Sequence, residues 1–173
     1  SETKTREFIF ISTSSSTTSE EYYLSSSGED REPKLFLPRK QDVRYSILSH
    51  KEKFFVYYKD KEHLNGMVYT APQTQVSDRL SWTLLVPHRE DVRLDSIGVY
   101  QDYIALEERR EGLTEIRILT SQGQEQGKIH FPEPVYTISL RGNSQYEATT
   151  IRYVYSSLNR PSSLYEYDLT TGE

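Results

Sequence analysis

The chain has 173 residues, a net charge of −5, 35% hydrophobic residues and a mean hydropathy of −0.72. This length can bury a domain-sized core, and the acidic balance argues against a nucleic-acid binder. The absence of cysteine excludes disulfides and thiolate metal sites, and no apolar stretch approaches the length of a membrane span.

Short strand-like segments separated by turns follow one another along the whole chain, and helical signals are nearly absent. Tyrosine and phenylalanine are abundant, as is usual in β-rich proteins. In chain order, the predicted strands are residues 8–11, 21–25, 34–37, 43–48, 54–58, 67–70, 82–86, 93–99, 103–106, 114–119, 128–131, 135–140, 153–155 and 164–169.

A repeat of 45 to 50 residues relates these strands to one another. Pro38–Arg44 and Pro87–Arg93 match in layout, each after a short apolar strand, and residues 131–135 form a degenerate third copy. Continuous apolar runs begin at Phe8, Phe54, Tyr103 and Tyr153, which are 46, 49 and 50 residues apart. A period of this length that contains only β-strands is typical of propeller blades.

Glycine-bearing turns recur in the same phase. They end at Gly28, Gly123 and Gly172, where we expect the positive φ of a tight hairpin, whereas the second repeat has Pro72 in the corresponding loop.

If the four strands of a blade are named A to D and the continuous apolar runs are the B strands, the predicted strand order along the chain is BCD, ABCD, ABCD, ABC. The fold class predicted is therefore all-β, a partial β-propeller with two complete four-stranded blades and two partial ones. The predicted blades span residues 1–38, 39–87, 88–132 and 133–173. Two open ends suggest that the chain is part of a longer protein.

Two segments between strands have alternative interpretations. The helix-like stretch around Glu107-Glu108-Arg109-Arg110-Glu111 is broken by Gly112, and we interpret residues 108–112 as a hairpin loop between B and C strands. The serine-rich tract Ser12–Ser19 resembles a linker, but its position between two strands favours a surface hairpin loop.

Two stretches of sequence resemble the propeller of oligopeptidase B, within the prolyl oligopeptidase family of serine peptidases. They are Val86–Val92 followed by Leu106–Leu113, and Tyr153–Asp168 with its Ser-Ser turn, proline and Tyr-Glu-Tyr-Asp strand. The resemblance extends over essentially the full chain. It implies a seven-bladed parent propeller joined to an α/β-hydrolase domain, with the first blades and the hydrolase domain lying outside this chain.

Chemical motifs are sparse. The nucleophile motif Gly-x-Ser-x-Gly is absent, and the similarly spaced Gly123-Gln124-Glu125-Gln126-Gly127 falls in a predicted hairpin between C and D strands. The histidines (His50, His63, His88, His130) do not have metal-ligand spacing, and surface or loop positions are expected. We predict no catalytic, cofactor-binding or metal-binding residue.

Two groups of side chains could serve binding instead. The run Glu107–Glu111 could contact another domain or a charged peptide, although a solvated hairpin with local ion pairs is favoured. Trp82 and the tyrosines could form a ligand platform, although their phase on the strands favours core between blades.

The resemblance implies a non-catalytic propeller fragment. Its partners would be the remaining blades and hydrolase domain of the same parent, which would cleave short peptides after Arg or Lys in the cytoplasm. The alternative is a propeller used as a protein-interaction platform in a non-enzymatic protein, since fold does not imply function. We also expect self-association through terminal blades, whose open faces are predicted to carry Phe8, Phe10, Tyr153 and Tyr155.

Overall fold

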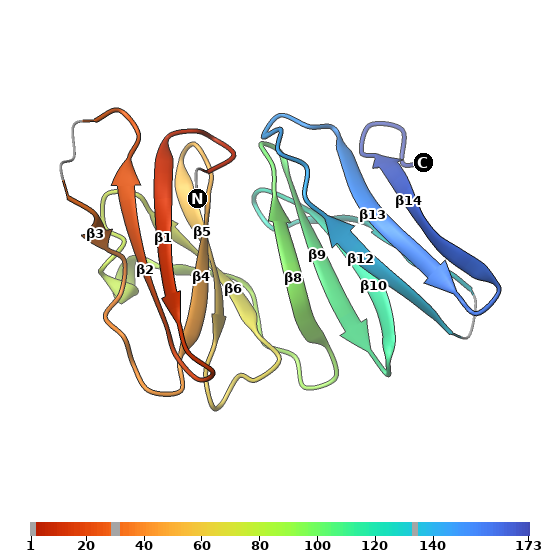
Figure 1. The fold of residues 1–173 in the computed structure, drawn as a ribbon, viewed down its shortest axis with the longest axis horizontal. Helices are drawn as coiled ribbons and strands as arrows, with labels where there is room; N and C mark the ends of the chain where they lie inside the picture. Colours follow the sequence, from red (N-terminus) through yellow and green to blue (C-terminus); the bar gives the residue numbers. More distant parts are fainter. Residues whose placement is uncertain (1–2, 29–31, 133–134) are drawn as a thin grey trace. The chain divides into compact units, whose positions relative to one another are not determined.

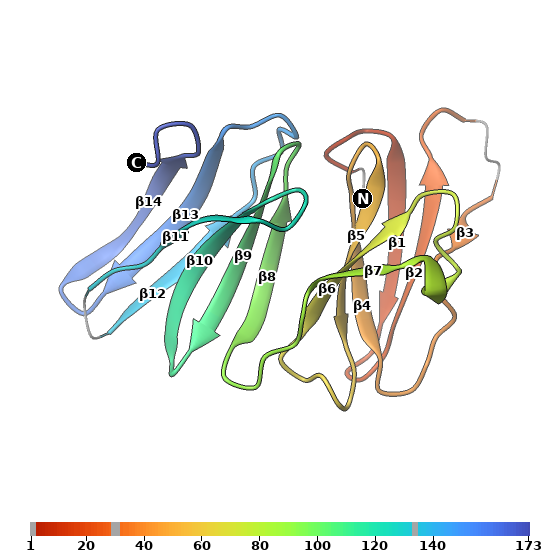
Figure 2. The ribbon, with the colours of Figure 1, turned by 180° about the vertical axis from the view of Figure 1, so that it is seen from behind.

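Antiparallel β-strands make up nearly all of the regular secondary structure in the described part of the chain (Figures 1 and 2). The structure is a computed structural model that describes residues 3–28, 32–132 and 135–173. Within these residues there is no α-helix, only the short 3₁₀ turn η1 (Arg79–Ser81). Consequently the described part of the chain contains no helix able to cross a membrane.

The strands form four separate sheets, each with its strands in sequence order. The first sheet consists of β1 (Phe8–Ser14), β2 (Ser19–Ser25) and β3 (Lys34–Leu35). The second consists of β4 (Arg44–Ser49), β5 (Lys53–Lys59), β6 (Met67–Pro72) and β7 (Thr83–Val86). The third consists of β8 (Arg93–Val99), β9 (Tyr103–Arg110), β10 (Leu113–Thr120) and β11 (Glu125–Ile129). The fourth consists of β12 (Tyr136–Arg141), β13 (Thr150–Ser157) and β14 (Arg160–Asp168).

This pattern of three, four, four and three strands confirms the predicted partial propeller. Most differences in strand bounds are small. The D strand predicted over residues 34–37 pairs only through Lys34 and Leu35. Part of the degenerate third repeat, Glu133 and Pro134, lies outside the described residues.

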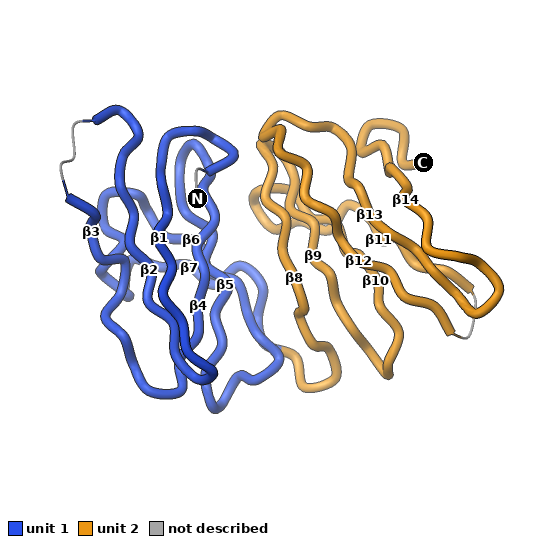
Figure 3. Tube along the Cα trace, in the orientation of Figure 1, with its two compact units in different colours: residues 1–88 blue, residues 89–173 orange. Residues whose placement is uncertain are grey.

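The chain divides into two compact units, residues 1–88 and 89–173, each holding two sheets (Figure 3). In unit 1 the core lies between the first two sheets and is strongly aromatic. Phe54 on β5 is its centre, with ring centroids 4.9 Å from Phe8 and 5.8 Å from both Phe10 and Phe36. Such edge-on aromatic contacts add to the stabilisation that burial provides.

In unit 2 the core lies between the third and fourth sheets. Ile116 and Ile118 on β10 share it with Ile138 on β12 and Tyr155 on β13. All four residues are buried. Ile116 and Ile118 are two positions apart on β10, so their side chains point to the same face of the sheet.

The same alternation overturns one prediction about the terminal sheets. Phe10, Tyr153 and Tyr155 are buried and Phe8 is half-buried, because all four face the neighbouring sheet of their own unit. The outward face of β1 instead carries Ile9 and Ile11, which are 37% and 44% exposed. The prediction that these aromatic residues lie on the open faces of the terminal sheets is therefore wrong.

The predicted glycine turns have the expected backbone. Gly28, Gly123 and Gly172 have φ values of 80°, 94° and 76°, as glycine allows in tight turns. The serine-rich tract is a hairpin as predicted, but its loop is only residues 15–18.

The loop predicted over residues 108–112 is wrong in extent. Strand β9 continues to Arg110, so only Glu111 and Gly112 form the turn, with φ values of 50° and 84°. Two consecutive residues with positive φ match the two-residue type I′ turn, whose twist suits a hairpin. The charged residues 108–110 are therefore strand residues.

Candidate functional site

The charged run on β9 is the most chemically distinctive feature of unit 2. Glu107 and Glu108 are 9% and 0% exposed. Since they are consecutive strand residues, their side chains point to opposite faces of the third sheet. Each carboxylate therefore has a different set of partners.

Glu108 is held by two arginines. Arg117 on β10 donates from Nη2 to Oε1 at 2.8 Å and from Nε to Oε2 at 3.1 Å. Arg89, from the segment before β8, also donates to Oε1. A fully buried carboxylate requires such pairing, because the desolvation cost is otherwise uncompensated. The cluster therefore links the segment before β8 to the two central strands of the third sheet, β9 and β10.

Glu107 connects the two sheets of unit 2. Its Oε2 accepts the backbone N–H of Leu140 on β12 at 2.8 Å. Burial raises the pKa of Glu107 above its ordinary value. The Leu140 hydrogen bond opposes this increase, the nearby Asp95 charge adds to it, and the charges of Arg109 and Arg141 oppose it. The Glu107 carboxylate thus provides an acceptor for the backbone N–H of Leu140.

The rest of the run is exposed. Arg109 donates from Nε to Asp95 Oδ2 at 2.9 Å, and Arg110 lies 3.4 Å from Asp91. The predicted solvated hairpin with local ion pairs is thus correct for Arg109 and Arg110 but wrong for the two glutamates. No Gly, Pro, Asn or Asp occurs between Tyr103 and Glu111. This absence of turn residues is the sequence signal that the strand extends beyond Leu106.

The histidines occupy different environments. His50 is in the turn between β4 and β5 but is buried, with its ring 5.7 Å from that of Phe55. His63 Nδ1 is 2.8 Å from Asp60 Oδ1, and its ring lies 5.3 Å from that of His88. His130 is exposed. Among the described residues, no group of three or more His, Asp or Glu side chains is arranged to hold a metal ion.

Trp82 belongs to the core of unit 1, as predicted. It is buried, its ring lies 5.6 Å from Phe36, and its Nε1 donates to Val76 O at 2.8 Å. The Arg79 guanidinium, on η1, lies 4.2 Å from the Trp82 ring, 4.6 Å from Tyr58 and 4.9 Å from Tyr69. This arginine covers the edge of the aromatic core that the sequence suggested as a ligand platform.

The segment Gly123–Gly127 lies at the junction of β10 and β11, in the predicted hairpin. Its central Glu125 is half-exposed and lies 3.6 Å from Arg117 Nη1. That arginine is already bound to Glu108, so Glu125 extends the same ionic cluster to the surface.

Comparison with known proteins agrees with this architecture. The family model for the N-terminal β-propeller domain of prolyl oligopeptidase matches residues 1–173. The chain therefore belongs to this family, whose members are serine peptidases. It is 25% identical over all 173 residues to Protease 2 of Moraxella lacunata and 26% identical over 136 residues to dipeptidyl aminopeptidase BI of Pseudoxanthomonas mexicana.

Solved structures of oligopeptidase B are similar over the full chain. The enzyme from Trypanosoma brucei, in a closed form with covalently bound antipain, has a TM-score of 0.89 and 27% identity. That from Leishmania major has a TM-score of 0.88 and 26% identity. The chain spans 26% of each of these structures, 24% of Protease 2 and 18% of the aminopeptidase.

Proposed function

We propose that the chain is a non-catalytic part of the propeller of an oligopeptidase B-like serine peptidase, where it restricts the substrates to short peptides. The match over the whole chain to oligopeptidase B, with a TM-score of 0.89, supports this proposal most strongly. Propeller blades surround a central channel, and a narrow channel excludes folded proteins by size.

The catalytic groups would belong to an α/β-hydrolase domain of the same polypeptide, joined to a seven-bladed propeller. The 173 residues contain no Gly-x-Ser-x-Gly, the motif that presents the nucleophile in that fold. We propose cleavage after Arg or Lys, as the resemblance to oligopeptidase B implies, and a cytoplasmic location.

The first test is the activity of the isolated chain. We expect no hydrolysis of a fluorogenic Arg-Arg peptide, because a serine without an oriented base and an oxyanion hole is a weak nucleophile. Turnover that copurifies with the chain and disappears on mutating one of its serines would contradict the proposal.

The second test is a chimera. The 173 residues replace the matching blades of the Trypanosoma brucei oligopeptidase B, and kcat/KM is measured for Arg-containing peptides of increasing length. We expect activity on short peptides and a steep decline with length, as in the unmodified enzyme measured in parallel. A soluble chimera that cleaves a folded protein as readily as a short peptide would refute the gating role.

The alternative, an interaction platform in a non-enzymatic protein, predicts a different gene. Sequencing the reading frame downstream of the codon for Glu173 separates the two. A hydrolase domain with Gly-x-Ser-x-Gly supports the peptidase, whereas further blades up to a stop codon support the platform.

We further propose that the isolated chain associates with a second copy of itself through the outward face of its first sheet. Ile9 and Ile11 are 37% and 44% exposed there, and exposed apolar sheet faces promote association. Light scattering over a concentration series should show dimers that Ile11→Lys weakens. Leu158→Lys, at an 86% exposed position in the turn between β13 and β14, is the control. A strictly monomeric chain at millimolar concentration would contradict this.

A further inference from the structure

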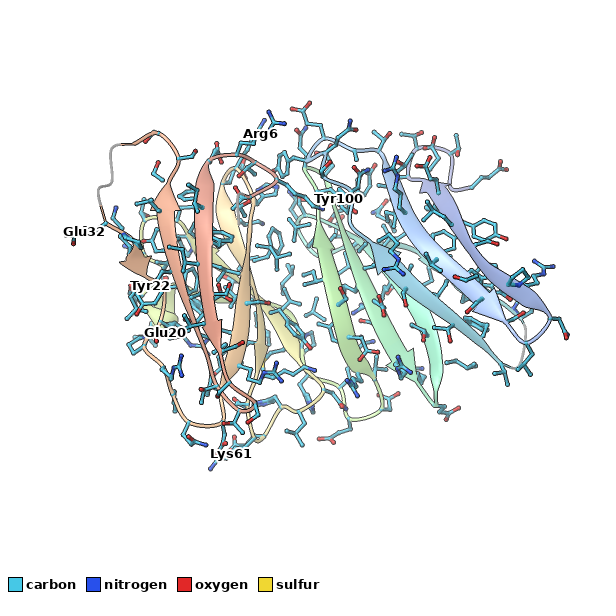
Figure 4. The ribbon with its side chains drawn as sticks, in the orientation of Figure 1. Arg6, Glu20, Tyr22, Glu32, Lys61 and Tyr100 are labelled. Atoms are coloured by element: carbon cyan, nitrogen blue, oxygen red, sulfur yellow. The ribbon has the colours of Figure 1, made fainter. Side chains whose placement is uncertain are left out.

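A solvent-open cavity at one end of unit 1, lined mostly by exposed side chains, has no role in the architecture described above. Its volume is about 300 Å³, and its wall comes from three connections and the strand ends beside them. The lining residues are Ser16, Thr17, Asp42, Arg44, Lys59, Asp60, Lys61 and Leu64. In Figure 4, Lys61 marks this end of unit 1, beyond the last residue of β5. This volume is at the lower end for ligand pockets, so it suits a small molecule or one chemical group.

The wall of this cavity carries three cationic side chains, Arg44, Lys59 and Lys61, and two carboxylates, Asp42 and Asp60. Arg44 and Lys59 are directly opposite each other in the pairing of β4 with β5. Like charges in directly opposite positions destabilise a sheet. Gly66 accommodates this arrangement, because a Cβ there would lie 2.9 Å from the Tyr57 ring and 3.1 Å from Lys59 Cε. The glycine thus leaves space for the Lys59 side chain, whose Nζ lies 5.2 Å from the centroid of the Tyr57 ring.

The acidic residues of the wall form hydrogen bonds to other groups rather than ion pairs with these cations. Asp60 Oδ1 accepts the backbone N–H groups of Glu62 at 3.0 Å and His63 at 2.8 Å, and it contacts the His63 ring. Asp42 Oδ1 accepts Gln41 Nε2 at 2.9 Å. Within the described residues, neither Arg44 nor Lys61 has an ion-pair partner. Two cations are therefore available to a ligand.

We propose that this cavity binds an oxyanion, the carboxylate or phosphate group of a small ligand. Arg44 would bind two oxygens side by side, as guanidinium groups do with carboxylates and phosphates. Lys61 would supply a second positive charge, and the hydroxyls of Ser16 and Thr17 lie on the same wall. A bound anion would also relieve the repulsion between Arg44 and Lys59. The site is independent of the peptidase proposal, because it needs only unit 1.

Titration of the full 173-residue chain tests the site, with backbone amide shifts followed by NMR. The probes are inorganic phosphate, N-acetylglycylglycine and the C-terminal amide of that peptide. We expect saturable shifts at Thr17, Lys61 and Leu64 with phosphate or with the free carboxylate, and none with the amide. Binding should weaken as sodium chloride is raised. Saturable shifts with phosphate alone, or with the free carboxylate alone, would identify which chemical group supplies the oxyanion. No saturable shift with either probe, or equal shifts with the amide, would overturn the proposal.

Single charge-removing variants locate the binding. Arg44→Gln and Lys61→Gln should each raise Kd about tenfold, the usual effect of losing a charge-assisted hydrogen bond. Arg160→Gln, at an exposed position of β14 in unit 2, removes the same charge and should leave Kd unchanged. Arg44→Gln also removes the repulsion from Lys59, so its urea midpoint should be at least that of the starting chain. A loss of binding that follows a loss of folding, or equal weakening by Arg160→Gln, would refute the site.

Discussion

Arg117 on β10 clamps the carboxylate of Glu108 on β9, with Nη2 2.8 Å from Oε1 and Nε 3.1 Å from Oε2. The two residues are diagonal neighbours, because Glu108 lies opposite Glu115 in the strand pairing and Arg117 lies opposite Leu106. Arg89 completes the cluster from the segment before β8. A buried charge is thus matched by two arginines from separate parts of unit 2.

Glu108→Ala should strongly destabilise unit 2. Removing one partner of a buried ionic cluster leaves uncompensated charge, and we expect a loss of about 3 kcal/mol in the free energy of unfolding. Urea denaturation measures it. Glu115→Ala is the matched control, because Glu115 pairs with Lys128 at 3.2 Å in a more exposed position, and such pairs contribute about 1 kcal/mol or less. Equal losses in the two variants would contradict the assignment.

Glu107 should give stability an unusual dependence on pH. Because the folded chain holds the Glu107 proton to a higher pH than the unfolded chain does, this residue's contribution falls as pH rises from its ordinary pKa through the raised one. Glu107→Gln removes this penalty and keeps an oxygen for the Leu140 N–H. We therefore expect Glu107→Gln to be more stable than the starting chain at pH 7 and equal to it below pH of about 4.

Urea denaturation at both pH values, with Glu107→Ala in parallel, tests this. The alanine variant leaves the Leu140 N–H without its acceptor, which should cost about 1–3 kcal/mol at either pH. If Glu107→Gln differs from the starting chain in unfolding free energy by the same amount at both pH values, the raised pKa of Glu107 does not destabilise the folded chain at pH 7.

Gly66 should be intolerant of a side chain. Its φ is +86°, and a Cβ would meet the Tyr57 ring at 2.9 Å. We expect Gly66→Ala to lower the unfolding free energy by more than about 1 kcal/mol. Gly142→Ala is the control, because no atom lies within 4 Å of its Cβ position. Thermal unfolding of both variants measures the difference, and similar melting temperatures would refute the steric argument.

Arg79 should stabilise the aromatic core of unit 1 through its position over three rings. Arg79→Ala should cost about 1 kcal/mol, and Arg79→Lys less than that, because its ammonium still interacts with the ring faces. Trp82 is the only tryptophan, so its fluorescence reports directly on the site. We expect greater acrylamide quenching in Arg79→Ala than in Arg160→Ala. Unchanged quenching would mean that Arg79 does not shield the ring.

Most of the fold was predictable from the sequence, because a blade repeats a local pattern. The continuous apolar runs at Phe54 and Tyr103 indicated strands buried on both faces, and both lie within central strands, β5 and β9. Turn glycines such as Gly123 marked where hairpins end. These signals depend on neighbouring residues, so no tertiary information was required.

The features that the sequence did not predict depend on contacts between residues far apart in the chain. The face to which Phe10 points depends on which side of its sheet a neighbour covers, and the period-two pattern alone does not give it. Glu107 and Glu108 appeared solvent-exposed because charged residues usually are. Their burial depends on Leu140 and Arg89, which lie 33 and 19 residues away in sequence.

The two-residue turn at Glu111 and Gly112 decides which glutamate meets which partner. If the hairpin slipped by one residue, the side chains of one strand would exchange faces. Glu107 would then point toward the arginines and Glu108 toward the backbone of β12, and neither environment would fit. The acidic pair therefore penalises the wrong alignment of β9 with β10 more severely than two leucines would, since an apolar side chain could be buried on either face.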